Sequence, residues 1–194
     1  GRLDPQTALI FGLCLSLLSV PLLTILTTPL AGLLAAVALL LYVLVYTPMK
    51  RYSAISTLIG AIPGAMPPLI GWTAVTGSLD TGGLALFFLM FIWQIPHSLA
   101  ISIFRQKEYA DAGLWVFAND YGLASTRAHI LIYTLPLVAM PFLLAELGLA
   151  SWTTLVVGSV LGVWLLWQAV DGWIRKKGPA WARKLFFTTL IYLS

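Results

Sequence analysis

Three segments of this largely apolar chain contain the residues best suited to chemistry. In one of them, residues 105–113, Glu108 and Asp111 are three positions apart. On a continuing helix this spacing puts both carboxylates on one face, where they could bind a Mg²⁺ ion that bridges to the phosphates of a substrate. Arg105 and Lys107 could then hold the same anion. A solvated turn whose ion pairs contribute little is the alternative.

A second polar segment, residues 46–52, contains the adjacent cations Lys50 and Arg51. Arginine binds phosphate oxygens through a bidentate fork and lysine binds them as a point charge, so the pair is suited to a phosphorylated substrate. Basic residues at the end of a membrane segment also fix its orientation without binding a ligand. Both interpretations stay open at this point.

His97 is the third candidate, and it lies inside an apolar stretch, roughly two helical turns before the next charged residues. Ionisable side chains at that depth in a membrane are rare and tend to line cavities. A neutral histidine that forms a hydrogen bond with a neighbouring helix would look the same in the sequence. A metal or haem ligand is a further alternative, although a lone histidine is weak support for one.

Long apolar runs carry or separate these candidate residues along the chain. Hydrophobic residues make up 60% of the chain and charged residues only 9%, whereas soluble domains carry about 25% charged residues. Each run is close to the ~20 residues that cross a bilayer, and only helices satisfy their own backbone polar groups in lipid. We therefore predict an all-α, polytopic bundle of membrane helices. The predicted spans are residues 8–26, 30–46, 53–75, 83–104, 128–149 and 152–173.

The basic residues are distributed very unevenly over this predicted topology. If each run crosses the bilayer, all 11 Lys and Arg residues fall on one face, and the other face receives only Asp80 and Glu146. The positive-inside rule then places the basic face in the cytoplasm. The net charge of +4 favours anionic lipid or a phosphorylated substrate over nucleic acid as a partner. The basic residues are Arg2, Lys50, Arg51, Arg105, Lys107, Arg127, Arg175, Lys176, Lys177, Arg183 and Lys184.

The third span has an unusual composition. Pro63, Pro67 and Pro68 lie close together in it, so we predict that this helix bends or breaks. Gly60 and Gly64 would let a neighbouring helix approach closely. The span is then either a kinked packing helix or a helix bent to make room for a ligand.

The domain organisation follows from the spans. Residues 185–194 are too short to cross a bilayer, so we interpret them as the start of a seventh span after six complete ones. The chain is expected to be a single transmembrane domain, residues 1–194, that is incomplete at both ends.

Several motifs in the middle of the chain occur together. They include Tyr-Thr-x-x-Lys-Arg at residues 46–51, Pro-Pro-Leu-Ile-Gly-Trp at residues 67–72, Pro-His at residues 96–97, Glu-Tyr at residues 108–109 and Ala-Gly at residues 112–113. With these motifs the chain resembles the haem O synthase (protohaem IX farnesyltransferase) family of UbiA-type intramembrane prenyltransferases. In members of that family, transmembrane helices surround a central cavity that opens toward the cytoplasm. They condense farnesyl diphosphate with the vinyl group of haem B, which gives haem O.

The resemblance also implies roles for individual residues. Lys50 and Arg51 would bind the diphosphate, and Glu108 would act with them as a catalytic residue in the second of two acidic motifs. Glu108 and Asp111 would hold Mg²⁺, the implied cofactor. Glu108 stands where the family usually has Asp, and the first acidic motif would precede residue 1. The implied substrate-binding residues are Tyr46, His97, Arg105, Tyr109 and Asp111.

Partners and location follow from the same resemblance. The expected partners are farnesyl diphosphate, haem B, the lipid bilayer and haem A synthase, with no nucleic acid. The expected location is the bacterial inner membrane, with the charged loops and the active site on the cytoplasmic side. Two alternatives remain: a relative that prenylates a quinone precursor or another aromatic acceptor, and a non-catalytic scaffold or transporter. A transporter would more often place ionisable residues near the middle of the membrane.

Overall fold

The protein is described here by a computed structural model that covers residues 4–194. Arg2, which we assigned to the basic face, lies outside the described residues. Between residues 4 and 194 the chain consists of helices joined by short loops and contains no strand. The elements are α1 (Pro5–Leu26), α2 (Pro29–Leu40), the π-helix η1 (Leu41–Tyr46), α3 (Thr47–Met49), α4 (Ser56–Thr76), α5 (Thr81–Phe104), α6 (Gln106–Asp111), α7 (Phe117–Asp120), α8 (Gly122–Glu146), α9 (Trp152–Ile174) and α10 (Pro179–Leu193).

The prediction of an all-α membrane bundle is confirmed. Six helical stretches are long and apolar enough to cross a bilayer, and each overlaps one predicted span. They are Pro5–Leu26, Pro29–Met49, Ser56–Thr76, Thr81–Phe104, Gly122–Glu146 and Trp152–Ile174. The second of these is continuous through α2, η1 and α3.

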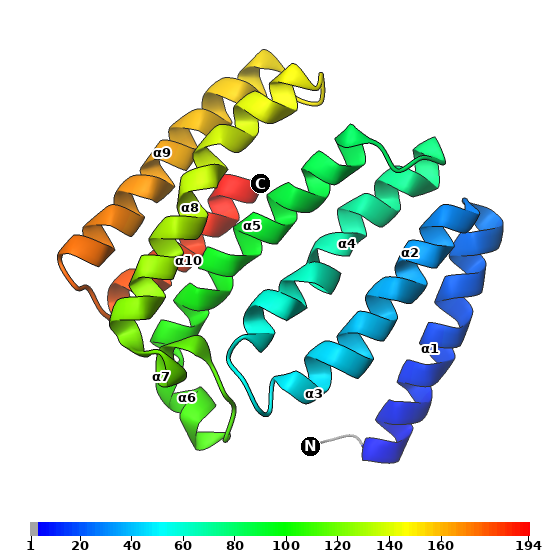
Figure 1. Cartoon of the computed structure of the whole chain (residues 1–194), viewed down its shortest axis with the longest axis horizontal. Coiled ribbons are helices and arrows are strands. Elements are labelled where there is room, and N and C mark those ends of the chain that lie inside the picture. The colour runs from blue at the N-terminus through cyan, green and yellow to red at the C-terminus, as the bar shows by residue number, and fades with distance from the viewer. Residues whose placement is uncertain (1–3) are drawn as a thin grey trace.

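The packing centres on α5, which contacts α4 on one side and α8 and α10 on the other. In Figure 1 the helices α1, α2, α4 and α5 lie in sequence order, with α8 and α9 beyond α5 and α10 behind them. Fully buried aliphatic side chains fill the contact region around α5. They include Ile95, Leu99, Ile103, Ile130, Leu137, Leu165 and Leu185. By contrast, α1 has no buried residue, and most of its apolar side chains are exposed.

The last helix starts earlier than predicted, at Pro179 rather than near residue 185. Proline is well suited to the first turn of a helix, where its missing N–H has no partner to lose. Side chains tie α10 to its neighbours: the Trp181 indole donates to the Gln168 carbonyl at 2.9 Å, and the Tyr192 hydroxyl donates to the Leu137 carbonyl at 2.6 Å. Arg183 and Lys184 therefore belong to a packed helix rather than to the loop in which we expected them.

We predicted that the third span bends or breaks. The break is wrong, because α4 runs without interruption through Pro63, Pro67 and Pro68, and the bend stays a prediction. Neighbouring helices and side chains can compensate for the backbone bonds that proline removes from a membrane helix. Here α4 packs between α2 and α5. Gln94 of α5 donates to the Ala61 carbonyl at 2.7 Å and so ties the two helices together, although Ala61 is not a carbonyl that the prolines deprive of a donor. Tight packing by neighbouring elements thus outweighs the local effect of the prolines.

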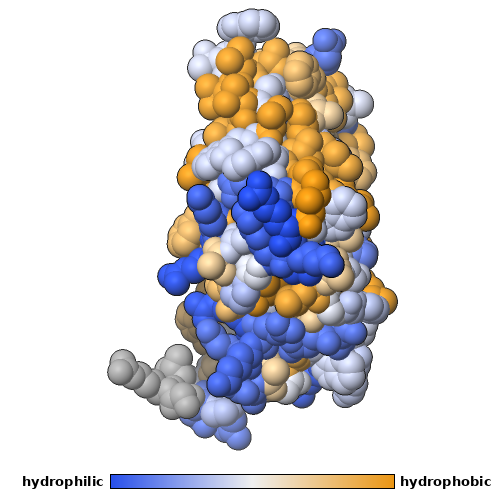
Figure 2. Space-filling model, turned by 90° about the vertical axis from the view of Figure 1, so that its left-hand side faces the viewer, coloured by the Kyte–Doolittle hydropathy of each residue, from blue (hydrophilic) through white to orange (hydrophobic). Residues whose placement is uncertain are grey.

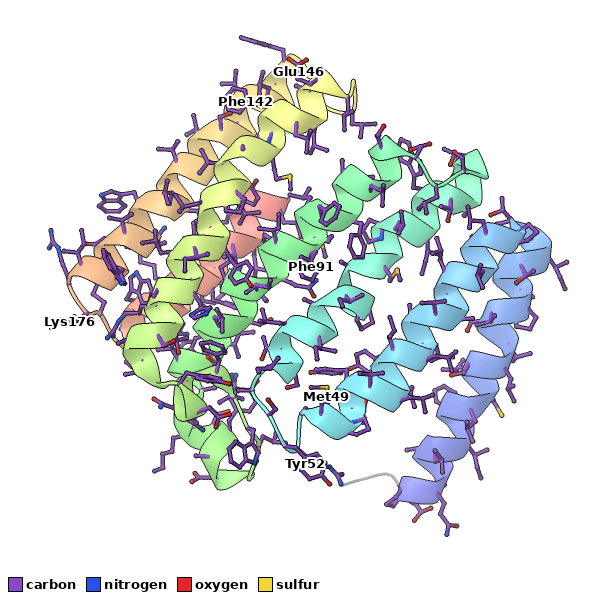
Figure 3. The ribbon with its side chains drawn as sticks, in the orientation of Figure 1. Met49, Tyr52, Phe91, Phe142, Glu146 and Lys176 are labelled. Atoms are coloured by element: carbon purple, nitrogen blue, oxygen red, sulfur yellow. The ribbon has the colours of Figure 1, made fainter. Side chains whose placement is uncertain are left out.

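Polar residues gather at one end of the bundle, as predicted. The end of α3, the short helices α6 and α7, and the turn between α9 and α10 lie at the same end (Figure 1). Figure 3 shows Glu146 at the opposite end from Tyr52 and Lys176. Chemistry that needs basic side chains is therefore expected at this end of the bundle, since the opposite end of the described chain carries only the acids Asp80 and Glu146.

Candidate functional site

A cavity of about 340 Å³ opens between η1, α4, α5 and the segment that follows α6. We call it the inner cavity. Lys50, Tyr46 and Tyr109 lie at its charged end, while Gly64, Gln94 and Ser98 line its deeper part. The remaining lining residues are Tyr42, Ser56, Thr57, Gly60, Ala61, Ile101, Ser102, Leu114, Trp115 and Val116. A cation at the end of a partly apolar cavity suits a ligand with an anionic head and an apolar chain.

The π-helix η1 shapes one wall of the inner cavity. Its wider turn places Tyr42 and Tyr46 side by side, with ring centroids 5.1 Å apart. The Thr47 hydroxyl donates to the Tyr42 carbonyl at 2.8 Å. Lys50 Nζ lies 6.0 Å from the centroid of the Tyr46 ring. Short π-helical turns inside membrane or soluble helices are frequent at functional sites, and sequence reasoning missed this one.

Gly60 allows the ring of Tyr46 to lie directly against α4. A Cβ atom added at Gly60 would lie 2.6 Å from two ring carbons of Tyr46, which is closer than packed carbon atoms approach. Gly64 makes the same kind of space for the Gln94 side chain. Both glycines thus make room for side chains of neighbouring helices, and the groups that they accommodate both line the inner cavity. A close approach of the helix backbones at these positions stays a prediction.

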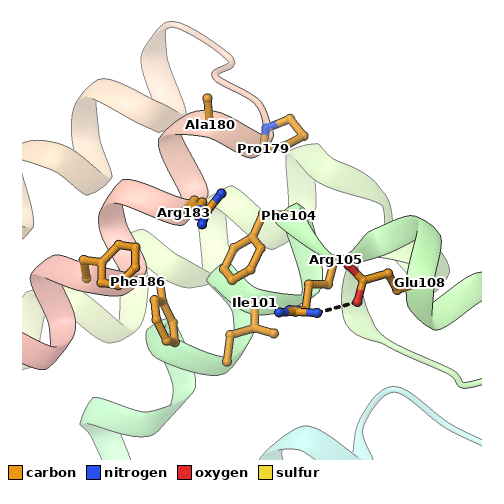
Figure 4. Close-up of a pocket in the computed structure, with 9 residues that line it drawn as sticks. Ile101, Phe104, Arg105, Glu108, Pro179, Ala180, Arg183 and Phe186 are labelled. Carbon is orange, nitrogen blue, oxygen red and sulfur yellow. Dashed lines mark hydrogen bonds and ion pairs between the residues drawn. The ribbon is translucent and has the colours of Figure 1, made fainter.

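A second cavity, of about 480 Å³, lies between the end of α5 and the start of α10. We call it the α10 cavity, and Figure 4 shows its lining. Arg105 and Glu108 form an ion pair there, with the Arg105 guanidinium 5.9 Å from the Phe104 ring. Ile101 lines both cavities, so they share one wall of α5. The other residues of this lining are Pro179, Ala180, Arg183, Phe186 and Phe187.

The structure distributes the predicted site residues over these two cavities. Lys50, Tyr46 and Tyr109 meet at the inner cavity, whereas Arg105 and Glu108 line the α10 cavity. Arg51, Asp111 and His97 line neither. Their proposed roles therefore stay predictions.

The acidic pair on α6 is exposed to solvent, as Glu108 and Asp111 both lie on the surface of this short helix. The local ion pair that we considered as an alternative is present between Glu108 and Arg105. Within residues 4–194 no three acidic, histidine or cysteine side chains come together as a metal-binding cluster. One or two carboxylates together with substrate phosphates are the usual Mg²⁺ ligands in phosphate sites, so the α6 pair fits a metal that also binds a phosphorylated substrate.

His97 lies between α5 and α10. Its ring stacks on Trp93 and packs against Phe186, with centroids 4.8 and 4.5 Å away. The Thr189 hydroxyl donates to the Phe186 carbonyl at 2.6 Å, so it accepts a hydrogen bond from His97 Nδ1 at 2.8 Å. This assigns the proton to Nδ1 and leaves the lone pair on Nε2. The arrangement agrees with a histidine bonded to a neighbouring helix, one side chain away from the α10 cavity.

Comparison with known proteins gives the chain its family. The model of the UbiA prenyltransferase family matches residues 1–191. A "Protoheme IX farnesyltransferase" of Anaeromyxobacter sp. (strain Fw109-5) is 47% identical over 100% of this chain and 65% of the relative. Proteins with the same name from Sorangium cellulosum (strain So ce56) and Yersinia pseudotuberculosis serotype O:3 (strain YPIII) are 49% and 40% identical.

These two matches cover 99% and 100% of this chain, and 69% and 66% of the respective relatives. The chain thus spans about two thirds of the length of the curated relatives that it matches. No solved structure matches it. The match to the family model extends over nearly the whole chain, and the chain belongs to the UbiA prenyltransferase family.

Proposed function

We propose that the protein transfers a farnesyl group from farnesyl diphosphate to the vinyl group of haem B and so forms haem O. The observation that carries this proposal is the similarity over the whole chain, at up to 49% identity, to proteins named protoheme IX farnesyltransferase. The inner cavity supports it, because a cation and two tyrosines lie at the charged end of an otherwise apolar helical bundle.

In this proposal the inner cavity binds the prenyl donor. Lys50 holds the diphosphate, with the adjacent Arg51 as a second cation, and the farnesyl chain extends past Gly64 toward the apolar interior. Charge stabilisation of the leaving diphosphate favours ionisation of the allylic C–O bond. The faces of Tyr42 and Tyr46 are suited to an allylic cation through cation–π attraction. Exclusion of water from the deeper cavity protects that cation from early capture.

Glu108 and Asp111 would hold Mg²⁺ on the diphosphate in this proposal. The ion supplies charge neutralisation of the leaving group when it is bound. Glu108 would have to give up its ion pair with Arg105 and turn from the α10 cavity toward the inner cavity. This change would free the guanidinium for a substrate anion. We further propose that Arg105, Tyr109 and His97 contribute to substrate binding from the two sides of α5.

The proposed reaction breaks the C–O bond of farnesyl diphosphate and releases diphosphate. A C–C bond forms between the farnesyl C1 and the terminal vinyl carbon of haem B. The carbocation left on the other vinyl carbon takes up water and loses a proton, which gives the hydroxyethylfarnesyl group. We propose that this takes place at the cytoplasmic face of a bacterial inner membrane and that haem A synthase uses the product.

The test uses the full-length protein in membrane vesicles with Mg²⁺, farnesyl diphosphate and haem B, and mass spectrometry of the extracted pigments. The expected result is a farnesylated, hydroxylated haem that forms only when both substrates and the metal ion are present. Formation of product after complete chelation would refute the metal requirement. If folded protein leaves haem unmodified but prenylates a quinone precursor offered in its place, the proposed acceptor is wrong.

A further inference from the structure

Arg127, near the start of α8, is a buried charge without a carboxylate partner. Only 8% of its surface is exposed, and its guanidinium donates one hydrogen bond, from Nη1 to the Lys177 carbonyl at 2.7 Å. Among residues 4–194 no acidic side chain forms an ion pair with it. A buried cation is costly unless an anion and further hydrogen bonds compensate it. The other donors of Arg127 are not among the buried atoms without a partner, so they are accessible to an anionic ligand.

The surrounding residues do not provide that anion. Asp171 is the acidic residue of this region, and it is already paired with both Arg175 and Lys177. Lys176, at the turn after α9, adds a further positive charge and forms no ion pair within the described part of the chain. Four basic residues thus share one carboxylate, and this end of α8 and α9 carries an excess of positive charge.

A cavity of about 530 Å³ lies beside Arg127, and it is lined by Ala124, Arg127, Trp173, Ile174 and Lys176. Its apolar wall faces outward, since Trp173 and Ile174 are 49% and 64% exposed. Figure 2, which views the side of the molecule that carries the α9–α10 turn, shows a hydrophilic region directly below a hydrophobic one. Tryptophan and basic residues at the ends of membrane spans are typical of the membrane–water interface.

We propose that this cavity binds an anionic phospholipid. The phosphate of the lipid lies between Arg127 and Lys176, and an acyl chain follows Trp173 and Ile174 toward the bilayer. Basic cavities between transmembrane helices on the cytoplasmic side are suited to anionic headgroups. The exposed apolar wall favours a lipid over free phosphate, because a free anion gains nothing from it. The site is separate from both cavities near α5 and does not depend on the proposed reaction.

The test is native mass spectrometry of the full-length protein in detergent, titrated with phosphatidylglycerol, with zwitterionic phosphatidylcholine and with inorganic phosphate. We expect preferential retention of phosphatidylglycerol. Lys176→Gln should weaken that binding about fivefold, the equivalent of about 1 kcal/mol for one basic residue near an anionic lipid. Arg127→Gln should weaken it more, and Lys107→Gln, an exposed lysine on α6 that lines none of the three cavities, should leave it unchanged.

Three results would overturn the proposal. Equal retention of the two lipids would show that the protein has no preference for an anionic headgroup. Equal losses in Lys176→Gln and Lys107→Gln would show only general attraction to a basic surface. Displacement of the lipid by millimolar inorganic phosphate would assign the cavity to a free anion. If Arg127→Gln fails to fold, the exposed Lys176 still decides between these outcomes.

Discussion

Lys50 supplies the positive charge of the inner cavity. Its substitution tests the proposal that this side chain binds the diphosphate. Hydrogen bonds to charged groups contribute about 1.5–3 kcal/mol, so Lys50→Gln should lower kcat/KM for farnesyl diphosphate roughly 10- to 100-fold. The measurement is the rate of farnesyl transfer at varied donor concentration. Lys184→Gln is the control, since Lys184 is exposed on α10 and lines none of the three cavities. Equal rates for the two variants would remove Lys50 from the site.

Gly60 provides a second test at this scale, because any side chain there must displace Tyr46. Overpacking costs about 1–3 kcal/mol, so Gly60→Ala should lower both the thermal midpoint and the transfer rate. Gly71 is the matched control in the same helix, since an added Cβ there meets nothing within 4 Å. Gly71→Ala should be neutral or stabilise the fold by about 0.4–1 kcal/mol. Similar behaviour of the two variants in a melting experiment would contradict this packing.

At the scale of elements, α5 begins with a well-formed cap. Asp80 Oδ1 accepts hydrogen bonds from the backbone amides of Gly82 and Gly83 at 2.9 and 3.2 Å. The Gly83 amide, followed by the Ser78 hydroxyl, holds the pKa of the Asp80 carboxyl below its ordinary value. A lowered pKa means that this stabilisation is present above the unfolded-state pKa of about 3.9 and is lost as the pH falls through the folded-state value.

Asp80→Ala should therefore lower the thermal midpoint at neutral pH, because it removes the cap of α5. The difference from the unmodified protein should shrink as the carboxylate becomes protonated in acid. Glu146→Ala is the control, since Glu146 is an exposed acid at the end of α8 and forms no cap. Melting curves of the three proteins across the acid range check this, and a difference that persists below the folded-state pKa would argue against the cap.

Some features of the individual helices could be predicted from the sequence and others could not. The helical spans follow from apolar length alone, and the close packing at Gly60 and Gly64 follows from residue size. The continuity of α4 was not predictable from its prolines, because neighbouring helices stabilise it. The π-helix η1 leaves no signal in an apolar run of residues. The turn at Arg105 starts the separate helix α6, so Glu108 and Tyr109 line different cavities, although they are adjacent in the sequence.

For the whole molecule, the unequal distribution of basic residues predicts the orientation in the membrane. The native Cys14 would first be replaced by alanine, since it is exposed on α1. With Ser78→Cys or Lys107→Cys introduced singly, a membrane-impermeant maleimide should label position 78 only from outside the cytoplasm. Position 107 should react only when the cytoplasmic side is accessible. The reverse pattern would place the inner cavity on the other side of the membrane.

The charge distribution of the whole molecule can be predicted from the sequence, whereas the contacts between distant helices cannot. The gathering of charge at one end follows directly from counting charges between spans. The contacts of α10 do not, because only the folded bundle brings Phe186 and Thr189 beside His97. For the same reason the sequence singled out His97 without showing which helix it contacts.

The most direct measurement is photo-crosslinking of the full-length protein in membranes with a farnesyl diphosphate analogue that carries a diazirine on its chain, followed by peptide mass spectrometry. We predict adducts on residues that line the inner cavity, such as Gln94, Ser98 and Trp115, and their loss when farnesyl diphosphate competes. Competed adducts confined to Arg183 and Phe187 of the α10 cavity, or adducts that farnesyl diphosphate does not displace, would contradict the assignment of the inner cavity as the donor site.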